Sequence, residues 1–250
     1  MIRFEIDGAI ATIAFNRPQK KNAITAAMYQ AAADAFKEAG ANDAVRVIVM
    51  TGDGACFTAG NDLEDFLQSP PQGDDSPVTQ FMNTLRAMTK PVVAAVPGLA
   101  IGIGTTLLMH CDLVYASDRA KFAMPFTQLG LCPEFASSVL LPRLAGYQRA
   151  AEKLLLGEPF DANEAERMGL VNRVLPAEEL MPFVHAQAAK LTALPAESLR
   201  VTKQLMKTDL QTPVAAAMQT EMQHFMRMLN GPDAKEAFAA FLEKRKPCFR

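Results

Sequence analysis

Three short apolar runs, rich in β-branched residues, constrain the fold of this chain more than any other feature. They are VRVIVMTG (45–52), PVVAAV (91–96) and DLVYAS (112–117). Runs without apolar–polar alternation are typical of strands that are buried on both faces. Helical patterns alternate with them, because Thr25 can cap a helix running to about Gly40 and a second helix is expected near residues 103–110. This alternation predicts an α/β fold with a parallel sheet and helical crossovers.

The two ends of the chain differ in character. At the start, IRFEI and AIATIAF flank Asp7-Gly8, which predicts a β-hairpin. Asp161 and Glu164 resemble a capping box for a helix. Four helices are expected beyond Pro176, at 176–193, 196–208, 213–230 and 232–246. We therefore divide the chain into a core of residues 1–192 and a helical region of residues 193–250, whose apolar surface should pack on its own core or on another subunit.

Composition excludes several classes of partner. The net charge is −2, and most lysines and arginines are scattered, so we expect no nucleic-acid partner. The apolar stretch at 91–109 is interrupted by Pro97, Gly98, Gly102 and Gly104, which favours a strand, a turn and a buried helix over a membrane span. We expect no membrane partner.

The cysteines indicate a reducing compartment. Cys56, Cys111, Cys132 and Cys248 do not have the spacing of metal ligands, so we expect no metal site. The opening MIRFEIDGAIATIAF lacks a basic start followed by an apolar run, so it does not read as a secretion signal. A cytoplasmic location is the expectation.

Two glycine-containing segments each follow a buried strand and precede a helix. They are TAGND (58–62) and GLAIGIG (98–104). In parallel sheets, ligands gather beyond the carboxyl ends of strands, and helix amino ends offer free N–H groups. Two such segments side by side can aim two N–H groups at one oxygen and form an oxyanion hole, with Gly60 and Gly102 allowing close backbone approach. The alternative is that both are structural turns.

One carboxylate stands in an otherwise apolar stretch. Residues 129–144 read LGLCPEFASSVLLPRL, with Glu134 among leucine, cysteine, phenylalanine and valine. A buried unpaired carboxylate is costly. Glu134 is therefore a solvent-facing turn residue, an acid near the amino end of a helix that begins at Ser137-Ser138, or a poorly solvated base.

Several motifs in chain order resemble the crotonase superfamily of enoyl-CoA hydratases and isomerases. They are NRPQKKNAIT (16–25), FTAGNDL (57–63), PVVAAVPGLAIGIGTTLLMHCDLVYASDRAKF (91–122) and GLVNRVLP (169–176). The resemblance implies a crotonase-like spiral of ββα repeats with a helical C-terminal trimerisation region. It also implies acyl-CoA thioester substrates, no cofactor beyond the CoA of the substrate, and self-association as a homotrimer or a dimer of trimers.

The resemblance also assigns site residues. It places an oxyanion hole at the backbone N–H groups of Asn61 and Ile103. It implies contacts to substrate or CoA at Lys21, Ala23, Ile24, Ala59, Gly60, Asp62 and Leu63. Taken alone, Lys20-Lys21 reads equally well as a solvated pair, and Asp62 as a helix cap. His110, at the end of an apolar helix, reads as a core histidine.

Departures from the family pattern reduce the number of reactions that we expect this chain to catalyse. Hydratases of this superfamily carry two glutamates, and the corresponding places here are Thr106 and Phe126. The stretch CPEFASS resembles the peroxisomal-type Δ3,Δ2-enoyl-CoA isomerases, in which one glutamate catalyses. Glu134 is then the expected proton shuttle, made more basic by its apolar neighbours. The alternatives are another enolate-forming acyl-CoA lyase or hydratase, and a non-catalytic acyl-CoA binding protein.

Overall fold

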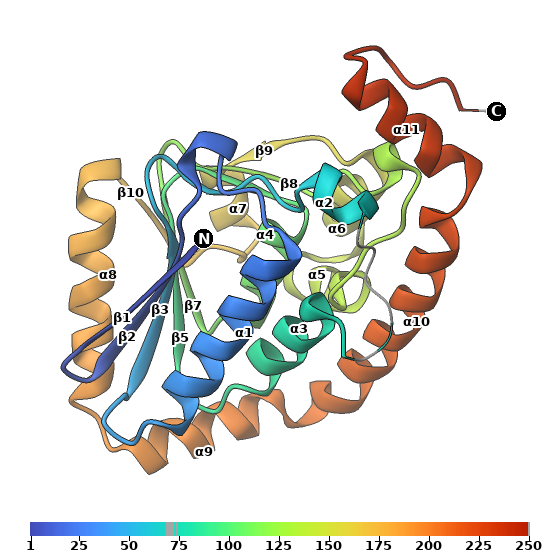
Figure 1. Cartoon of the computed structure of the whole chain (residues 1–250). Helices are drawn as coiled ribbons and strands as arrows, with labels where there is room; N and C mark the ends of the chain where they lie inside the picture. The colour runs from blue at the N-terminus through green and yellow to red at the C-terminus, as the bar shows by residue number, and fades with distance from the viewer. Residues whose placement is uncertain (69–72, 74, 250) are drawn as a thin grey trace.

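The fold is built from two β-sheets that share successive segments of the chain (Figure 1). The computed structural model describes residues 1–68, 73 and 75–249. The polar, proline-rich sequence QSPPQGDDSP (68–77) predicts a loop, and part of it lies outside the described residues. The larger sheet has the order β1-β2-β3-β5-β7-β10, and the smaller has the order β4-β6-β8-β9. The strands are β1 (Ile2–Asp7), β2 (Ile10–Phe15), β3 (Val47–Gly52), β4 (Cys56–Thr58), β5 (Val92–Val96), β6 (Leu99–Ile101), β7 (Leu113–Ser117), β8 (Lys121–Ala123), β9 (Phe160–Asp161) and β10 (Arg173–Leu175).

Successive turns of the chain repeat one ββα pattern. Strands β3, β5 and β7 enter the larger sheet, and each is followed by a strand of the smaller sheet, namely β4, β6 and β8. Helical segments then lead back to the next turn. The predicted spiral of ββα repeats is confirmed. The short strands β4, β6 and β8 were not expected from the sequence, and β6 lies where the sequence predicts a turn.

The larger sheet is covered by helices on both faces (Figure 1). Val47 and Val49 of β3 pack in the cluster that includes α8 (Ala177–Thr192). The alternate residues of β3, Ile48 and Met50, point instead into the main core, with α1 (Ala26–Ala41) and α3 (Pro77–Ala87). Burial of both faces explains why the strand sequences are apolar without alternation. Thr25 caps α1, as expected, by accepting a hydrogen bond from the Met28 N–H at 3.3 Å.

The C-terminal helices wrap around the core rather than extending away from it. In Figure 1, α9 passes below the larger sheet and α10 rises on the side opposite α8. The remaining helices are α2 (Leu63–Gln68), α4 (Ile103–Thr106), α5 (Ser137–Ala145), α6 (Tyr147–Ala151), α7 (Ala162–Arg167), α9 (Ala196–Lys207), α10 (Gln211–Leu229) and α11 (Pro232–Leu242). Among the described residues, none of the helices has the length and apolar character needed to cross a membrane.

Three expected helices differ in detail. The helix expected at 103–110 is α4 followed by a 3₁₀ turn. The last helix ends at Leu242 rather than at residue 246. Asp161 caps α7 by accepting from the Glu164 N–H at 2.8 Å, but the Glu164 carboxylate lies 2.6 Å from Lys153 Nζ and completes no capping box.

A buried ion pair fastens the C-terminal region to the core. Lys203 of α9 is 5% exposed, and its Nζ lies 2.6 Å from Asp112 Oδ2 and 2.8 Å from the Lys90 carbonyl oxygen. Asp112 Oδ2 also accepts the Val92 N–H at 2.8 Å. The pair therefore links α9 to the start of β5 and to the residue before β7.

Substituting Asp112→Asn tests this link. The change leaves a buried ammonium group without its counter-ion, and removing one partner of such a pair costs roughly 3–5 kcal/mol. We expect the free energy of unfolding in urea to fall by that order. The matched control is Arg200→Gln, which breaks the exposed pair with Glu197 on the same helix and should change stability little. Equal stability of the Asp112→Asn variant and the unsubstituted protein would contradict the claim that the Lys203–Asp112 pair fastens α9 to the core.

Candidate active site

The segments of interest follow three adjacent strands of the smaller sheet. Strand β4 leads into Ala59–Asn61, β6 into Gly102 and Ile103, and β8 into the longer loop that contains Glu134. These strands pair in parallel, β4 with β6 and β6 with β8. Because the carboxyl ends of parallel strands lie at one edge, the sheet brings the three segments together.

The two glycine segments approach closely at Gly60 and Gly104, whereas Gly102, expected to allow the close approach, has no neighbour within 4 Å of a Cβ built on it. A Cβ atom on Gly104 would lie 2.6 Å from Thr58 Cγ2, and a Cβ on Gly60 would lie 2.8 Å from the Ile101 carbonyl oxygen. Gly60 also has a φ of +87°, which disfavours any other residue. Glycine at these positions allows the close approach that places Asn61 and Ile103 at one cavity.

Asn61 and Ile103 each present a free backbone N–H. Asn61 forms a parallel bridge with Ile24, in which Ile24 N donates to Gly60 O at 2.8 Å and Asp62 N donates to Ile24 O at 2.9 Å. This pairing leaves the Asn61 N–H directed away from the bridge. Ile103 is the first residue of α4, so its N–H has no intrahelical acceptor. Neither N–H donates a hydrogen bond to any group in the described part of the chain, and both are able to bind one oxygen of a ligand.

The loop at residues 21–24 positions the first of these segments. Ala59 N donates to Lys21 O at 2.9 Å, and Thr58 Oγ1 donates to Asn22 O at 2.7 Å. Lys21 is exposed and Ala23 is half-buried. Ile24 is 2% exposed and uses both backbone polar groups, so it organises the loop instead of offering apolar surface to a ligand.

Asp62 has a structural task at the start of α2. Its Oδ2 lies 2.5 Å from Arg17 Nη1, and its Oδ1 accepts the Asp65 N–H at 3.2 Å. The expected helix cap is confirmed at the start of α2. Leu63, the first residue of α2, packs against the main core.

Glu134 is a buried carboxylate with one unpaired oxygen. The residue is 8% exposed, and its Oε1 accepts the Thr106 hydroxyl at 2.5 Å. Its Oε2 is buried without a partner among the described residues. Burial raises the pKa of Glu134 to about 8, with a further increase from the charge of Glu221 and an opposing effect of the Thr106 hydrogen bond. The solvent-facing alternative is therefore wrong, and a carboxyl group with this pKa can accept a proton and return it.

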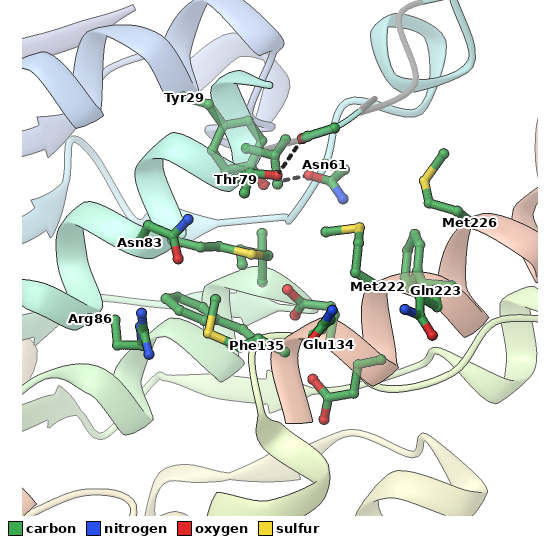
Figure 2. A pocket seen from close by; sticks show the side chains of 18 of the residues that line it. Tyr29, Asn61, Thr79, Asn83, Arg86, Glu134, Phe135, Met222, Gln223 and Met226 are labelled. Atoms are coloured by element: carbon green, nitrogen blue, oxygen red, sulfur yellow. Dashed lines mark hydrogen bonds between the residues drawn. The ribbon is translucent and has the colours of Figure 1, made fainter. Parts of the chain in front are cut away.

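A cavity of about 440 Å³ joins Glu134 to the two free N–H groups. Figure 2 shows side chains from α1, α3 and α10 around it, including Tyr29, Asn83 and Met222. Met218, Met222 and Met226 line the cavity on the α10 side. Met218 and Met226 also pack against the main core, whereas Met206 on α9 is 67% exposed. A pocket that is mostly apolar beside a few polar groups is suited to an acyl chain.

The two positions that distinguish this chain from hydratases have different surroundings. Thr106 of α4 contacts Glu134, whereas Phe126 is buried and is not among the residues lining the cavity. His110 is a core residue, as expected. Its ring stacks on Phe135 at 3.7 Å between centroids, its Nε2 lies 2.8 Å from the Phe135 carbonyl oxygen, and burial lowers its pKa to about 3.

Sequence reasoning missed Glu221, a second buried carboxylate at this cavity. It lies on α10, three residues after Met218 and four before Phe225, and therefore on the apolar stripe of the helix. An acid on an apolar stripe is a signal that was available in the sequence. The hydrogen-bond partners of Glu221, at residues 136 and 138, could not be identified from the sequence.

Comparisons with known proteins agree with this geometry. The family model described as Enoyl-CoA hydratase/isomerase matches residues 5–250. Enoyl-CoA delta isomerase 2 of Rattus norvegicus is 39% identical over 221 residues, and the match covers 86% of this chain but 56% of the rat protein. The chain thus spans little more than half of that relative. A probable enoyl-CoA hydratase of Mycobacterium leprae is 34% identical, over 98% of this chain and 96% of its own length.

A solved structure extends the likeness to the whole fold. The crystal structure of an enoyl-CoA hydratase/isomerase from Pseudoalteromonas atlantica T6c aligns with a TM-score of 0.95 at 37% identity, covering 100% of this chain and 99% of that one. The ββα spiral, the full-length family match and these relatives lead to one conclusion. The chain belongs to the enoyl-CoA hydratase/isomerase family of the crotonase superfamily.

Proposed function

We propose that this protein is a Δ3,Δ2-enoyl-CoA isomerase in which Glu134 is the single acid/base residue. The observation on which the proposal rests is the unpaired Oε2 of Glu134, buried at the cavity that Asn61 and Ile103 also line. Moving a double bond from C3–C4 to C2–C3 requires one group that removes a proton from C2 and returns a proton to C4. No separate cofactor takes part in this scheme.

The thioester binds through its carbonyl oxygen. The N–H groups of Asn61 and Ile103 donate to this oxygen, and the acyl chain occupies the cavity beneath α10. The CoA portion extends along the exposed side of the two paired loops, past Lys21, Ala23, Ala59 and Gly60. An ammonium group such as that of Lys21 is an adequate point charge for a CoA phosphate.

Proton transfer then takes place at one carboxylate. Oε2 of Glu134 accepts the C2 proton, and the electrons of the broken C–H bond form a dienolate whose charge falls on the thioester oxygen. One hydrogen bond to such an oxyanion is typically worth roughly 3–4 kcal/mol. Glu134 returns the proton to C4, the double bond settles between C2 and C3, and the carboxylate is regenerated. Thr106 holds Oε1, so that Oε2 is the oxygen that faces the substrate.

Hydration of a 2-enoyl-CoA is the second candidate, because hydratase-named relatives match this chain over nearly its full length. Hydration needs a base for the water and an acid for the carbon. Glu221 is the other carboxylate at the cavity, but both of its oxygens already accept hydrogen bonds from residues 136 and 138. This engagement favours isomerisation. A non-catalytic acyl-CoA binder remains the third outcome that the experiment below distinguishes.

We further propose that the enzyme acts as a cytoplasmic homotrimer or dimer of trimers. The support is family membership together with exposed apolar side chains in the C-terminal region, where Leu205 and Met206 on α9 are 69% and 67% exposed. Sedimentation equilibrium should give the mass of three or six chains. A monomer at micromolar concentration would contradict this part of the proposal.

Isomerase activity is tested with the Glu134→Gln variant. A 3-enoyl-CoA is converted to the conjugated 2-enoyl-CoA, and ultraviolet absorbance follows the product. Because an amide cannot accept the C2 proton, kcat should fall by about 10³-fold or more. Hydration of a 2-enoyl-CoA, measured alongside, should be slow for both proteins.

The control is Glu236→Gln, which removes a carboxylate from the exposed pair between α11 and Arg245 and should leave kcat unchanged. Isomerisation that survives in Glu134→Gln would sink the single-carboxylate mechanism. Acyl-CoA binding without turnover would favour the binder, and fast hydration would favour the hydratase.

The pH dependence supplies a separate test. Catalysis requires deprotonated Glu134, so kcat/KM should rise with pH with a midpoint near 8. The Thr106 hydroxyl stabilises the charged carboxylate and lowers its pKa. Thr106→Val should therefore move the midpoint upward by about half a pH unit or more, whereas Thr106→Ser should retain the original midpoint. A midpoint below pH 6 in the unsubstituted enzyme would contradict the desolvated-base description.

A further inference from the structure

Glu221 of α10 is tied to the segment that follows Glu134. Its Oε2 accepts the Ala136 N–H at 2.6 Å, and its Oε1 accepts the Ser138 N–H at 3.1 Å and the Ser138 hydroxyl. The glutamate is 7% exposed. A carboxylate that receives three donors at the amino end of α5 satisfies N–H groups that the helix itself leaves without partners.

The backbone at this point has an unfavourable conformation that needs external support. Phe135 and Ala136, the two residues directly after Glu134, have φ angles of 55° and 57°. Consecutive left-handed residues other than glycine are uncommon and persist only where the surroundings hold them. Three contacts do so: the bond from Ala136 N to Glu221, the contact of His110 with the Phe135 carbonyl, and the bonds from Ser137 N and Oγ to the Glu134 carbonyl.

We propose that Glu221 is a positioning residue for Glu134: by binding the N–H groups of Ala136 and Ser138, its carboxylate fixes the left-handed loop that directs Oε2 of Glu134 into the cavity. This inference rests on the proposed function, because it takes Glu134 to be the base. It goes beyond that function by making the docking of α10, more than eighty residues away in the chain, a condition for a productive site.

The two carboxylates differ in their hydrogen-bond partners. Burial raises the pKa of Glu221, and its three hydrogen-bond donors oppose this shift. Glu134 has one donor, the Thr106 hydroxyl, to oppose the effect of its own burial. The negative charge of Glu221 then raises the pKa of Glu134 further, after the larger effect of burial.

Other titratable and charged groups surround this pair. Tyr29 of α1 is buried, its hydroxyl donates to Asn61 Oδ1, and burial raises its pKa well above the usual value. His110 is neutral at these pH values. Burial likewise raises the pKa of the Cys132 thiol to about 11. Arg86 of α3 lies at the cavity wall, and the positive charges of Arg227 and Lys207 lower the pKa values of Cys132 and His110, respectively. Near pH 8, Tyr29, His110 and Cys132 are therefore neutral, and Glu221 is the acidic group whose charge acts on Glu134.

The experiment compares Glu221→Gln with Glu221→Asp in the full-length chain. The glutamine variant removes the charge and places an amide donor against the N–H donors of the loop. We expect kcat for 3-enoyl-CoA isomerisation to fall about 10- to 100-fold with KM within about twofold. The midpoint of kcat/KM should move to lower pH by about half a unit or more, because the repulsive charge is gone.

The aspartate variant keeps the charge with a shorter reach, so kcat should fall while the midpoint stays near 8. Glu236→Gln is the matched control and should change neither quantity.

A second readout does not depend on turnover. The titration of Glu134 is followed by NMR of ¹³C-labelled glutamate carboxyls, assigned with Glu134→Gln. In Glu221→Gln the Glu134 midpoint should fall, even if the enzyme proves to catalyse a different reaction. If the unsubstituted protein has no isomerase activity but the titration of Glu134 is shifted in Glu221→Gln, the isomerase proposal is overturned. The influence of Glu221 on Glu134 is then still supported.

Two results would overturn the inference itself. One is an unchanged kcat and an unchanged Glu134 titration in Glu221→Gln. The other is an unchanged kcat in both Glu221→Asp and Ser138→Ala, which keep the charge of the carboxylate but weaken its attachment to the loop. These two variants are used if Glu221→Gln does not fold, as judged by thermal unfolding.

Discussion

The parallel pairing of β4, β6 and β8 is the constraint on which the candidate site depends. Each strand is three residues long, and each continues into a segment that contributes one functional group. Parallel neighbours end at the same edge, so the N–H of Asn61, the N–H of Ile103 and the carboxylate of Glu134 reach one cavity. Gly60 and Gly104 allow the backbones to approach closely enough for this arrangement. The larger sheet and its helices support this edge without contributing the chemistry.

The electrostatics of the site follow from an uneven distribution of donors. Glu134 is buried with a single hydroxyl donor and one oxygen that has no partner among the described residues, and burial raises its pKa to about 8, as the proposed proton transfer requires. Glu221, nearby and equally buried, has its oxygens occupied by the start of α5. The same difference underlies our proposal of isomerisation by one carboxylate in preference to hydration by two. In our proposal, α10 has two roles: its methionines line the cavity, and its Glu221 positions Glu134.

Long apolar runs, helix caps and a polar residue among apolar neighbours were predictable from the sequence, whereas very short strands and contacts between distant segments were not. Strand β3 was evident because burial on both faces requires an uninterrupted apolar run, and Glu134 stood out because its neighbours are apolar. Strands β4, β6 and β8 are too short to show a pattern, and they form because each has partners in the smaller sheet. The contact from Ala136 to Glu221 joins residues 85 positions apart, and no local pattern encodes such a pairing.

The most direct test of the account is a crystal structure of the Glu134→Gln variant with a bound 3-enoyl-CoA. The account predicts the thioester oxygen within about 2.7–3.1 Å of the backbone nitrogens of both Asn61 and Ile103. It also predicts the side chain of residue 134 over the C2–C4 portion of the acyl chain, beneath α10. A thioester oxygen bound elsewhere, or an acyl chain that does not pass residue 134, would contradict it.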